Sequence, residues 1–171
     1  MDLKNQARTK IVITNNQKEI KIPTGIRMLV RRTCNAVLKL EKFKDAAEVS
    51  VTFVNNDEIQ KLNKQYREKN VPTDVLSFPM GEDGEFDVNP STGGKILGDI
   101  VISLERAAQQ AHRFGHTLER EVSYLTAHSM LHLLGYDHEE GGMDKVRMRE
   151  KEETVMLQLG LRITTNYAFD N

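Results

Sequence analysis

The amino-acid sequence predicts a mixed α/β (α+β) fold, in which a small central sheet of about four strands packs against helices. Two observations support this class. Short runs rich in β-branched residues alternate along the chain with longer segments whose apolar residues recur at helical spacing. The chain has 171 residues, 39% of them hydrophobic, which is enough for one packed core. It contains no internal repeat and no long linker, so we expect a single domain over residues 1–171.

The N-terminal half of the chain predicts two strand–helix units. Lys10–Thr14 is rich in β-branched residues and is followed by a pair of asparagines, and apolar residues over positions 26–38 then recur at helical spacing. Val49–Val54 alternates between apolar and polar residues, as a strand does. Asn56 is placed to cap the polar helix that follows, which should run to about Lys69.

The C-terminal half predicts two more strands and three helices. Thr73–Phe78 and Ile96–Ser103 have the composition of strands, and we expect the acidic, glycine-containing segment between them, Gly81–Gly94, to be a mobile loop. Gly115 is a helix stop and Thr117 a helix cap. The predicted helices cover residues 103–114, 118–134 and about 144–159.

Three histidines lie in one short stretch after Thr117. His128 and His132 are four residues apart, so in a helix their imidazoles project from one face. Gly135 stands where a left-handed residue commonly ends a helix, which lets the chain double back and bring His138 towards the same point. Three neutral imidazoles would leave a tetrahedral Zn²⁺ one open position for water. We therefore predict one zinc ion per chain, of the catalytic type, held by these three histidines.

Two alternatives compete with this zinc site. The histidine spacing matches the metzincin protease pattern H-E-x-x-H-x-x-G-x-x-H, but Ser129 stands where that pattern has its glutamate. A serine hydroxyl cannot be the general base at neutral pH, so a metallopeptidase is disfavoured. His112 and His116 are also four apart, but Gly115 interrupts the helix between them, and structural or surface roles are favoured for both.

Composition restricts the setting and the partners. Cys34 is the single cysteine, which excludes a disulfide framework and a cysteine-rich zinc fold, and its place in a helical pattern predicts a core residue. No apolar run is long enough for a signal peptide or a membrane span, so we expect a soluble, cytoplasmic protein with no membrane partner. The net charge of −1 leaves no overall basic field, so affinity for a polyanion must come from a local patch.

Several separate motifs carry a family resemblance. The run from His128 to His138 reads histidine-serine-x-leucine-histidine-leucine-x-glycine-tyrosine-aspartate-histidine. The other segments are Leu62–Arg67, Pro72–Pro79, Leu97–Ile100, Gly115–Glu121 and Met148–Glu153. In this order they resemble the signatures of the YbeY family of bacterial endoribonucleases and rRNA maturation factors, with Ser129 in place of a glycine. The resemblance covers about Val49 to Leu161.

This resemblance implies a zinc-dependent endoribonuclease with His128, His132 and His138 as ligands and Arg67 facing the metal as a phosphate clamp. It also implies a role in maturing the 3′ end of small-subunit rRNA and in ribosome quality control, with RNA and the ribosome or its proteins as partners. The chemistry is compatible, because zinc with three neutral ligands keeps its full charge and an arginine can bind phosphate oxygens bidentately. Single-stranded RNA is the expected substrate, since a flexible phosphodiester can reach a recessed metal.

Other assignments stay open. The proton acceptor, or a group that orients the metal ligands, could be Asp137, Glu139 or Glu140, and Asp137 could equally hold the turn that presents His138. Residues that could line the cleft, or be structural, are Thr73, Asp74, Ser77 and Asp99. The alternative function is a non-hydrolytic ribosome assembly factor with structural zinc, and a metallopeptidase is the less favoured one. We expect a monomer.

Overall fold

A computed structural model describes residues 7–137 and 142–161. The strands are β1 (Lys10–Asn15), β2 (Ala47–Val54), β3 (Val75–Pro79) and β4 (Lys95–Ser103). The helices are α1 (Ile26–Leu40), α2 (Asn56–Arg67), α3 (Leu104–Phe114), α4 (Leu118–Leu133) and α5 (Gly142–Gln158). The strands form one sheet in the order β1-β2-β4-β3, parallel except for β3, which is antiparallel to β4 at one edge. The predicted mixed α/β class is confirmed.

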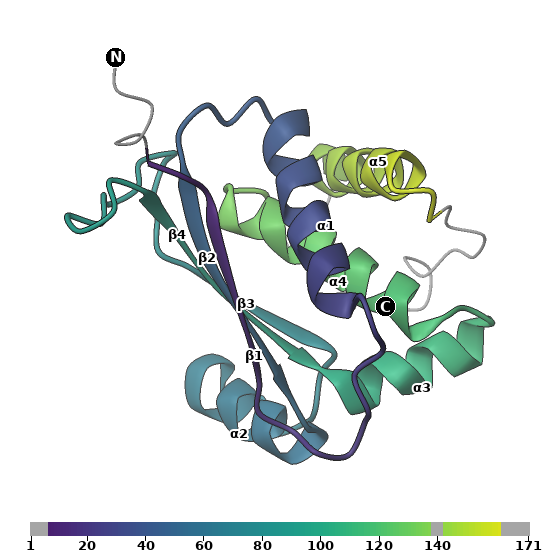
Figure 1. The fold of residues 1–171 in the computed structure, drawn as a ribbon. Helices are drawn as coiled ribbons and strands as arrows, with labels where there is room; N and C mark the ends of the chain where they lie inside the picture. The colour runs from purple at the N-terminus through teal and green to yellow at the C-terminus, as the bar shows by residue number, and fades with distance from the viewer. Residues whose placement is uncertain (1–6, 138–141, 162–171) are drawn as a thin grey trace.

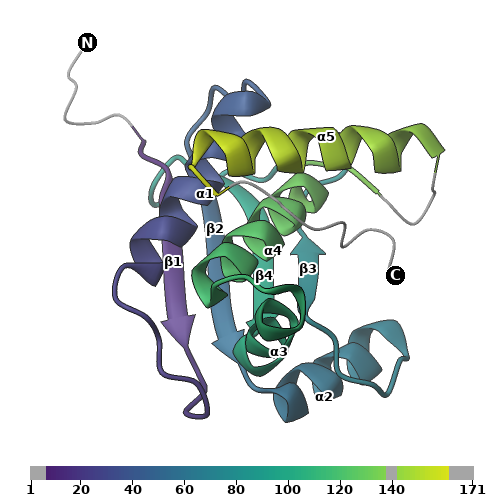
Figure 2. The ribbon, with the colours of Figure 1, turned by 90° about the vertical axis from the view of Figure 1, so that its right-hand side faces the viewer.

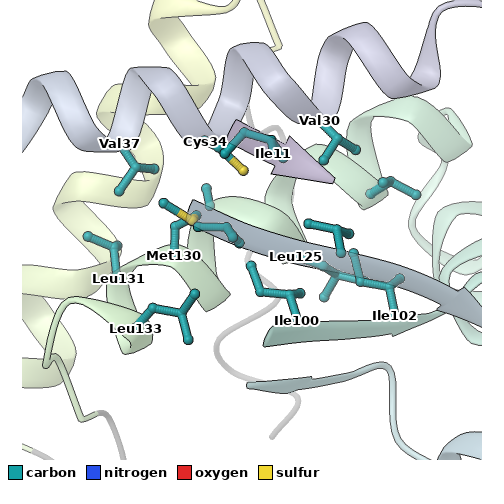
Figure 3. Packing of buried hydrophobic residues seen from close by; sticks show 14 of the residues in the cluster. Ile11, Val30, Cys34, Val37, Ile100, Ile102, Leu125, Met130, Leu131 and Leu133 are labelled. Atoms are coloured by element: carbon teal, nitrogen blue, oxygen red, sulfur yellow. The ribbon is translucent and has the colours of Figure 1, made fainter. Parts of the chain in front are cut away.

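The two faces of the sheet pack against different helices. Helices α1 and α4 cover one face and α5 lies across both of them, while α2 packs on the opposite face (Figures 1 and 2). On the first face Ile100 and Ile102 of β4 are fully buried among residues such as Leu125 and Met130 of α4 (Figure 3). On the second face Val101 joins a smaller cluster with Ile59 of α2. Alternate residues of β4 therefore belong to different cores.

Cys34 of α1 lies in the main core, as its helical setting predicts. Its side chain packs among the residues between α1 and α4 (Figure 3) and has no solvent exposure. Burial raises the pKa of the thiol to about 12, because the charged thiolate would lose its hydration there. The thiol is therefore a small apolar core group rather than a reactive one.

One local prediction differs from the structure. Asn55, and not Asn56, caps α2, because its side chain accepts a hydrogen bond from the backbone N–H of Glu58 at 2.9 Å. The Asn56 side chain instead accepts from the Ser103 hydroxyl at 2.7 Å. The segment Gly81–Gly94 is a loop between β3 and β4, as predicted, and it carries hydrogen-bonded turns and isolated bridges.

No helix in the described ranges combines the length and the apolar composition that crossing a bilayer requires. This finding agrees with the hydropathy of the sequence.

Candidate metal centre

Helix α4 is buried on nearly all sides, and its accessible residues form one stripe. From Glu121 to Leu133 every residue is buried except Tyr124, His128 and His132, which are half-buried and four residues apart. The four-residue spacing places these three side chains on one face of the helix, one above the other. The rest of the helix packs against α1, α3, α5 and the sheet. The histidines therefore occupy the one face of this segment that is not covered.

His128 and His132 point their Nε2 atoms at one place. The two atoms are 3.2 Å apart, and the rings are nearly perpendicular, at 79°. Two imidazole nitrogens that each bind a tetrahedral zinc at about 2.0–2.1 Å are separated by about 3.3 Å. The observed separation therefore fits two ligands of one ion.

The other ring nitrogen of each histidine is already engaged. Nδ1 of His132 lies 2.7 Å from the backbone carbonyl oxygen of Tyr136, which can only accept, so this nitrogen carries the proton. Nδ1 of His128 donates to the Glu152 carboxylate at 2.6 Å. In the neutral rings both Nε2 atoms then present lone pairs to one another. A cation bound by both nitrogens would relieve the repulsion between the two lone pairs. The arrangement of the two rings therefore fits a metal ion.

Glu152 is held in place from two sides. It is only 4% exposed and accepts a second hydrogen bond, at 3.0 Å, from the hydroxyl of Tyr124. Burial, followed by the charge of Glu152, raises the pKa of Tyr124, so the phenol stays protonated and donates. The Tyr124 ring also stacks on His128, with 6.3 Å between the centroids.

The turn after α4 has the geometry that the glycine predicts. Gly135 has a φ of 107°, and the N–H groups of Gly135 and Tyr136 donate to the carbonyls of His132 and Leu131 at 3.0 Å each. This is a Schellman motif, in which a left-handed residue satisfies the last carbonyls of a helix. The motif turns the Tyr136 carbonyl back towards the His132 ring.

The third predicted ligand, His138, lies outside the described residues, as do Glu139 and Glu140. Within the ranges that the structure covers, no third histidine, cysteine, aspartate or glutamate completes with this pair a group that could hold a metal ion. The ligand set of three histidines therefore stays a prediction, of which the structure brings two members together.

Arg67 lies in the last turn of α2 and is exposed. Both α2 and α4 contact the edge strand β3, but they pack on opposite faces of the sheet, so Arg67 and the two histidines lie on elements that this strand separates (Figure 1). Its role as a phosphate clamp stays a prediction.

Asp74 and Ser77 lie on the histidine side of β3, and Asp99 does not. The Asp74 carboxylate accepts from Gln110 of α3 at 3.1 Å, and its charge contributes to the raised pKa of Tyr124. Ser77 alternates with Leu76, whose side chain faces α2, so it faces α4. Asp99 pairs with Phe78 on the α2 side, where burial raises its pKa.

Three residues considered as alternative metal ligands or as a general base do not lie with the histidine pair. His112 is exposed in α3, and His116 follows Gly115, whose φ of 73° ends that helix, so the two do not share a helical face. Nδ1 of His116 accepts from Arg120 at 3.2 Å. Ser129 is fully buried.

Sequence reasoning missed Glu152 and Tyr124. Tyr124 precedes His128 by one helical turn, which is a signal that could have been used. Glu152 lies in the Met148–Glu153 segment of the family resemblance, but its contact with His128 depends on how α5 packs against α4.

The family described as Endoribonuclease YbeY matches residues 12–160 of the chain. A protein named Endoribonuclease YbeY from Caldanaerobacter subterraneus subsp. tengcongensis is 52% identical over 157 residues, which cover 89% of this chain and 98% of the relative. One of the same name from Thermoanaerobacter sp. (strain X514) is 50% identical, covering 88% and 98%. The solution structure of TM1509 from Thermotoga maritima has a TM-score of 0.58 at 25% identity and covers 88% of this chain and 91% of that one.

Proposed function

Because the chain belongs to the Endoribonuclease YbeY family, we propose that it hydrolyses phosphodiester bonds of RNA in a zinc-dependent reaction. The observation that carries the zinc requirement is the 3.2 Å separation of the His128 and His132 Nε2 atoms, with both Nδ1 atoms engaged elsewhere. Zn²⁺ bound by these two residues and the predicted ligand His138 would supply a Lewis acid for a phosphate oxygen or an attacking water.

The accessibility of the histidines supports a flexible, single-stranded substrate. The side chain of His128 is 21% exposed and sits in a narrow stripe between buried residues. A phosphodiester in a regular duplex is held at a fixed depth, whereas an unpaired strand can bend to reach such a site. The polar contacts of RNA with this site are therefore expected at the backbone rather than at base edges.

Arg67 is the proposed phosphate clamp. Its planar guanidinium can donate two parallel hydrogen bonds to phosphate oxygens, which orients the group and offsets the charge that develops at phosphorus. Its exposure at the end of α2 leaves it accessible to a ligand as large as RNA. Lys64 of the same helix is an exposed cation one turn earlier, which makes it a matched control.

The biological role that we propose is maturation of the 3′ end of small-subunit rRNA, together with ribosome quality control. The ribosome or its proteins would then be the partners. The support for this role is the resemblance of the histidine motif and its flanking segments to the family.

The test is cleavage of a labelled single-stranded RNA by the zinc-loaded protein and three variants purified identically. We expect His132→Ala to lose both zinc and cleavage, Arg67→Ala to keep zinc but lose most cleavage, and Lys64→Ala to retain both. Equal cleavage by all four proteins would identify a contaminating nuclease and overturn the proposal. Cleavage by Arg67→Ala at the wild-type rate would overturn the clamp alone.

A further inference from the structure

We propose that Lys151 and Glu152, consecutive residues of α5, are positioning residues that hold the two metal-facing histidines of α4 in their binding geometry. The proposal rests on the metal centre of the proposed function. It adds that the orientation of His128 and His132 is imposed from a different helix, through two separate contacts.

The first contact is direct. Glu152 accepts the Nδ1–H of His128 at 2.6 Å, so that in the neutral ring Nε2 is the nitrogen with the lone pair, and the contact fixes the plane of the ring. The hydroxyl of Tyr124 donates to the other carboxylate oxygen at 3.0 Å. Because Glu152 is on the buried face of α5, with Met148 and Val155, the packing of that helix sets the place of the carboxylate.

The second contact acts through Tyr136. The ammonium of Lys151 lies 2.6 Å from the Glu41 carboxylate and 5.5 Å from the centre of the Tyr136 ring. The Tyr136 hydroxyl takes part in side-chain hydrogen bonds with both Glu41 and Lys151, which place it within this cluster. The backbone carbonyl of Tyr136 is the group that accepts from Nδ1 of His132 at 2.7 Å. Lys151 and Glu41 thus fix the ring, and the ring fixes the carbonyl that orients His132.

The two contacts have a common origin. Residues 151 and 152 diverge by about 100° around a helix, so one points towards the turn after α4 and the other towards the stripe on α4. Helix α5 packs on both α1 and α4 (Figure 2), which brings Glu41 and the histidines within reach of adjacent residues. The docking of one helix therefore sets both ring orientations together.

The test uses Glu152→Gln and Lys151→Met, with Glu153→Gln and Lys145→Met as matched controls. Glu153 is half-exposed and pairs with Arg149, and Lys145 is exposed on the same helix. For each protein we would measure the Zn²⁺ dissociation constant by chelator competition, the visible absorption of bound Co²⁺, and urea unfolding of the metal-free form. Tyr124→Phe, which removes one donor to Glu152, replaces Glu152→Gln if that variant does not fold.

We expect Glu152→Gln to raise the Zn²⁺ dissociation constant by about 10- to 100-fold and to alter the Co²⁺ spectrum. Lys151→Met should raise the dissociation constant by less. Both control variants should bind Zn²⁺ as the wild type does. A Zn²⁺ affinity unchanged in both variants would overturn the proposal, even with lower stability of the metal-free protein, because the contacts would then be structural only. If the two variants bind Zn²⁺ more weakly but the wild-type protein does not cut RNA, the positioning role is supported and the proposed function is overturned. A wild-type protein that binds no Zn²⁺ would overturn both.

Discussion

The backbone of β4 at Gly98 approaches the carbonyl oxygen of Phe78 in β3 so closely that a Cβ atom there would lie 2.3 Å from that oxygen. The same Cβ would lie 3.0 Å from a methyl group of Leu133, at the end of α4. Gly98 has a φ of 142°, a conformation that side-chain-bearing residues rarely adopt. This glycine therefore sets how closely the edge of the sheet and the histidine helix can pack.

Gly98→Ala should lower the free energy of unfolding by about 3 kcal/mol or more, because the added methyl group meets backbone that cannot move without breaking the β3–β4 ladder. Urea denaturation measures the change. Gly84→Ala is the control, since Gly84 also has a positive φ, of 77°, but has open space around its Cβ position. It should cost about 1 kcal/mol, from backbone strain alone. Equal losses in the two variants would contradict the steric argument.

Ser129→Ala should raise the free energy of unfolding by about 1 kcal/mol. The Ser129 hydroxyl is fully buried and has no hydrogen-bond partner in the part of the chain that the structure describes, so its removal relieves an unmet desolvation cost. Ser123→Ala provides the contrast, because the Ser123 hydroxyl shares a 2.7 Å hydrogen bond with Thr33. That variant should lose about 1 kcal/mol. A loss of stability in Ser129→Ala, measured by urea denaturation, would refute the prediction.

Zinc should stabilise the folded protein by mass action. At about 100 times its dissociation constant, a ligand that binds only the folded state adds about 2.7 kcal/mol to the free energy of unfolding. We expect this increase in the wild type and in His116→Ala, whose histidine lies outside α4. His132→Ala should show almost none. Calorimetric unfolding with and without Zn²⁺ gives the comparison, and an equal shift in all three proteins would place the zinc elsewhere.

The buried thiol of Cys34 should make stability fall at alkaline pH. Its pKa is raised from 9.0 to about 12 in the folded state, so between these values the unfolded chain has lost a proton that the folded chain retains. The free energy of unfolding is therefore unaffected by the thiol below pH 9.0 and declines as the pH rises from 9.0 to about 12. Comparing wild type with Cys34→Ala isolates the contribution, since the variant lacks the titrating group. A parallel pH dependence in the two proteins would show that other groups cause the decline.

Much of the fold follows from local patterns in the sequence. The helical spacing over residues 26–38 and the stop at Gly115 predict helix boundaries that the structure reproduces within a few residues. The convergence of His128 and His132 also follows from local geometry, because a four-residue spacing within one helix fixes it. These predictions succeed because each depends on residues close together in the chain.

Contacts between distant segments were beyond such reasoning. Nothing in the sequence near Glu152 indicates that its carboxylate meets a histidine 24 residues earlier, since the packing angle of two helices decides it. The cap at Asn55 was misassigned to Asn56 because either asparagine could serve, and the choice depends on the neighbouring Ser103. The sequence around Gly98 does not predict the close backbone approach to Phe78, because that approach arises only once β3 pairs with β4.

The dependence of both histidines on α5 also has a consequence for synthesis. A ribosome produces the chain from its N-terminus, so α4 emerges with His128 and His132 before Lys151 and Glu152 exist. The contact between Lys151 and Glu41, 110 residues apart, can form only once α5 has been made. A nascent chain thus holds the two imidazoles without the groups that orient them. The proposed metal centre is therefore completed only after α5 has been made, later than the helix that carries its histidines.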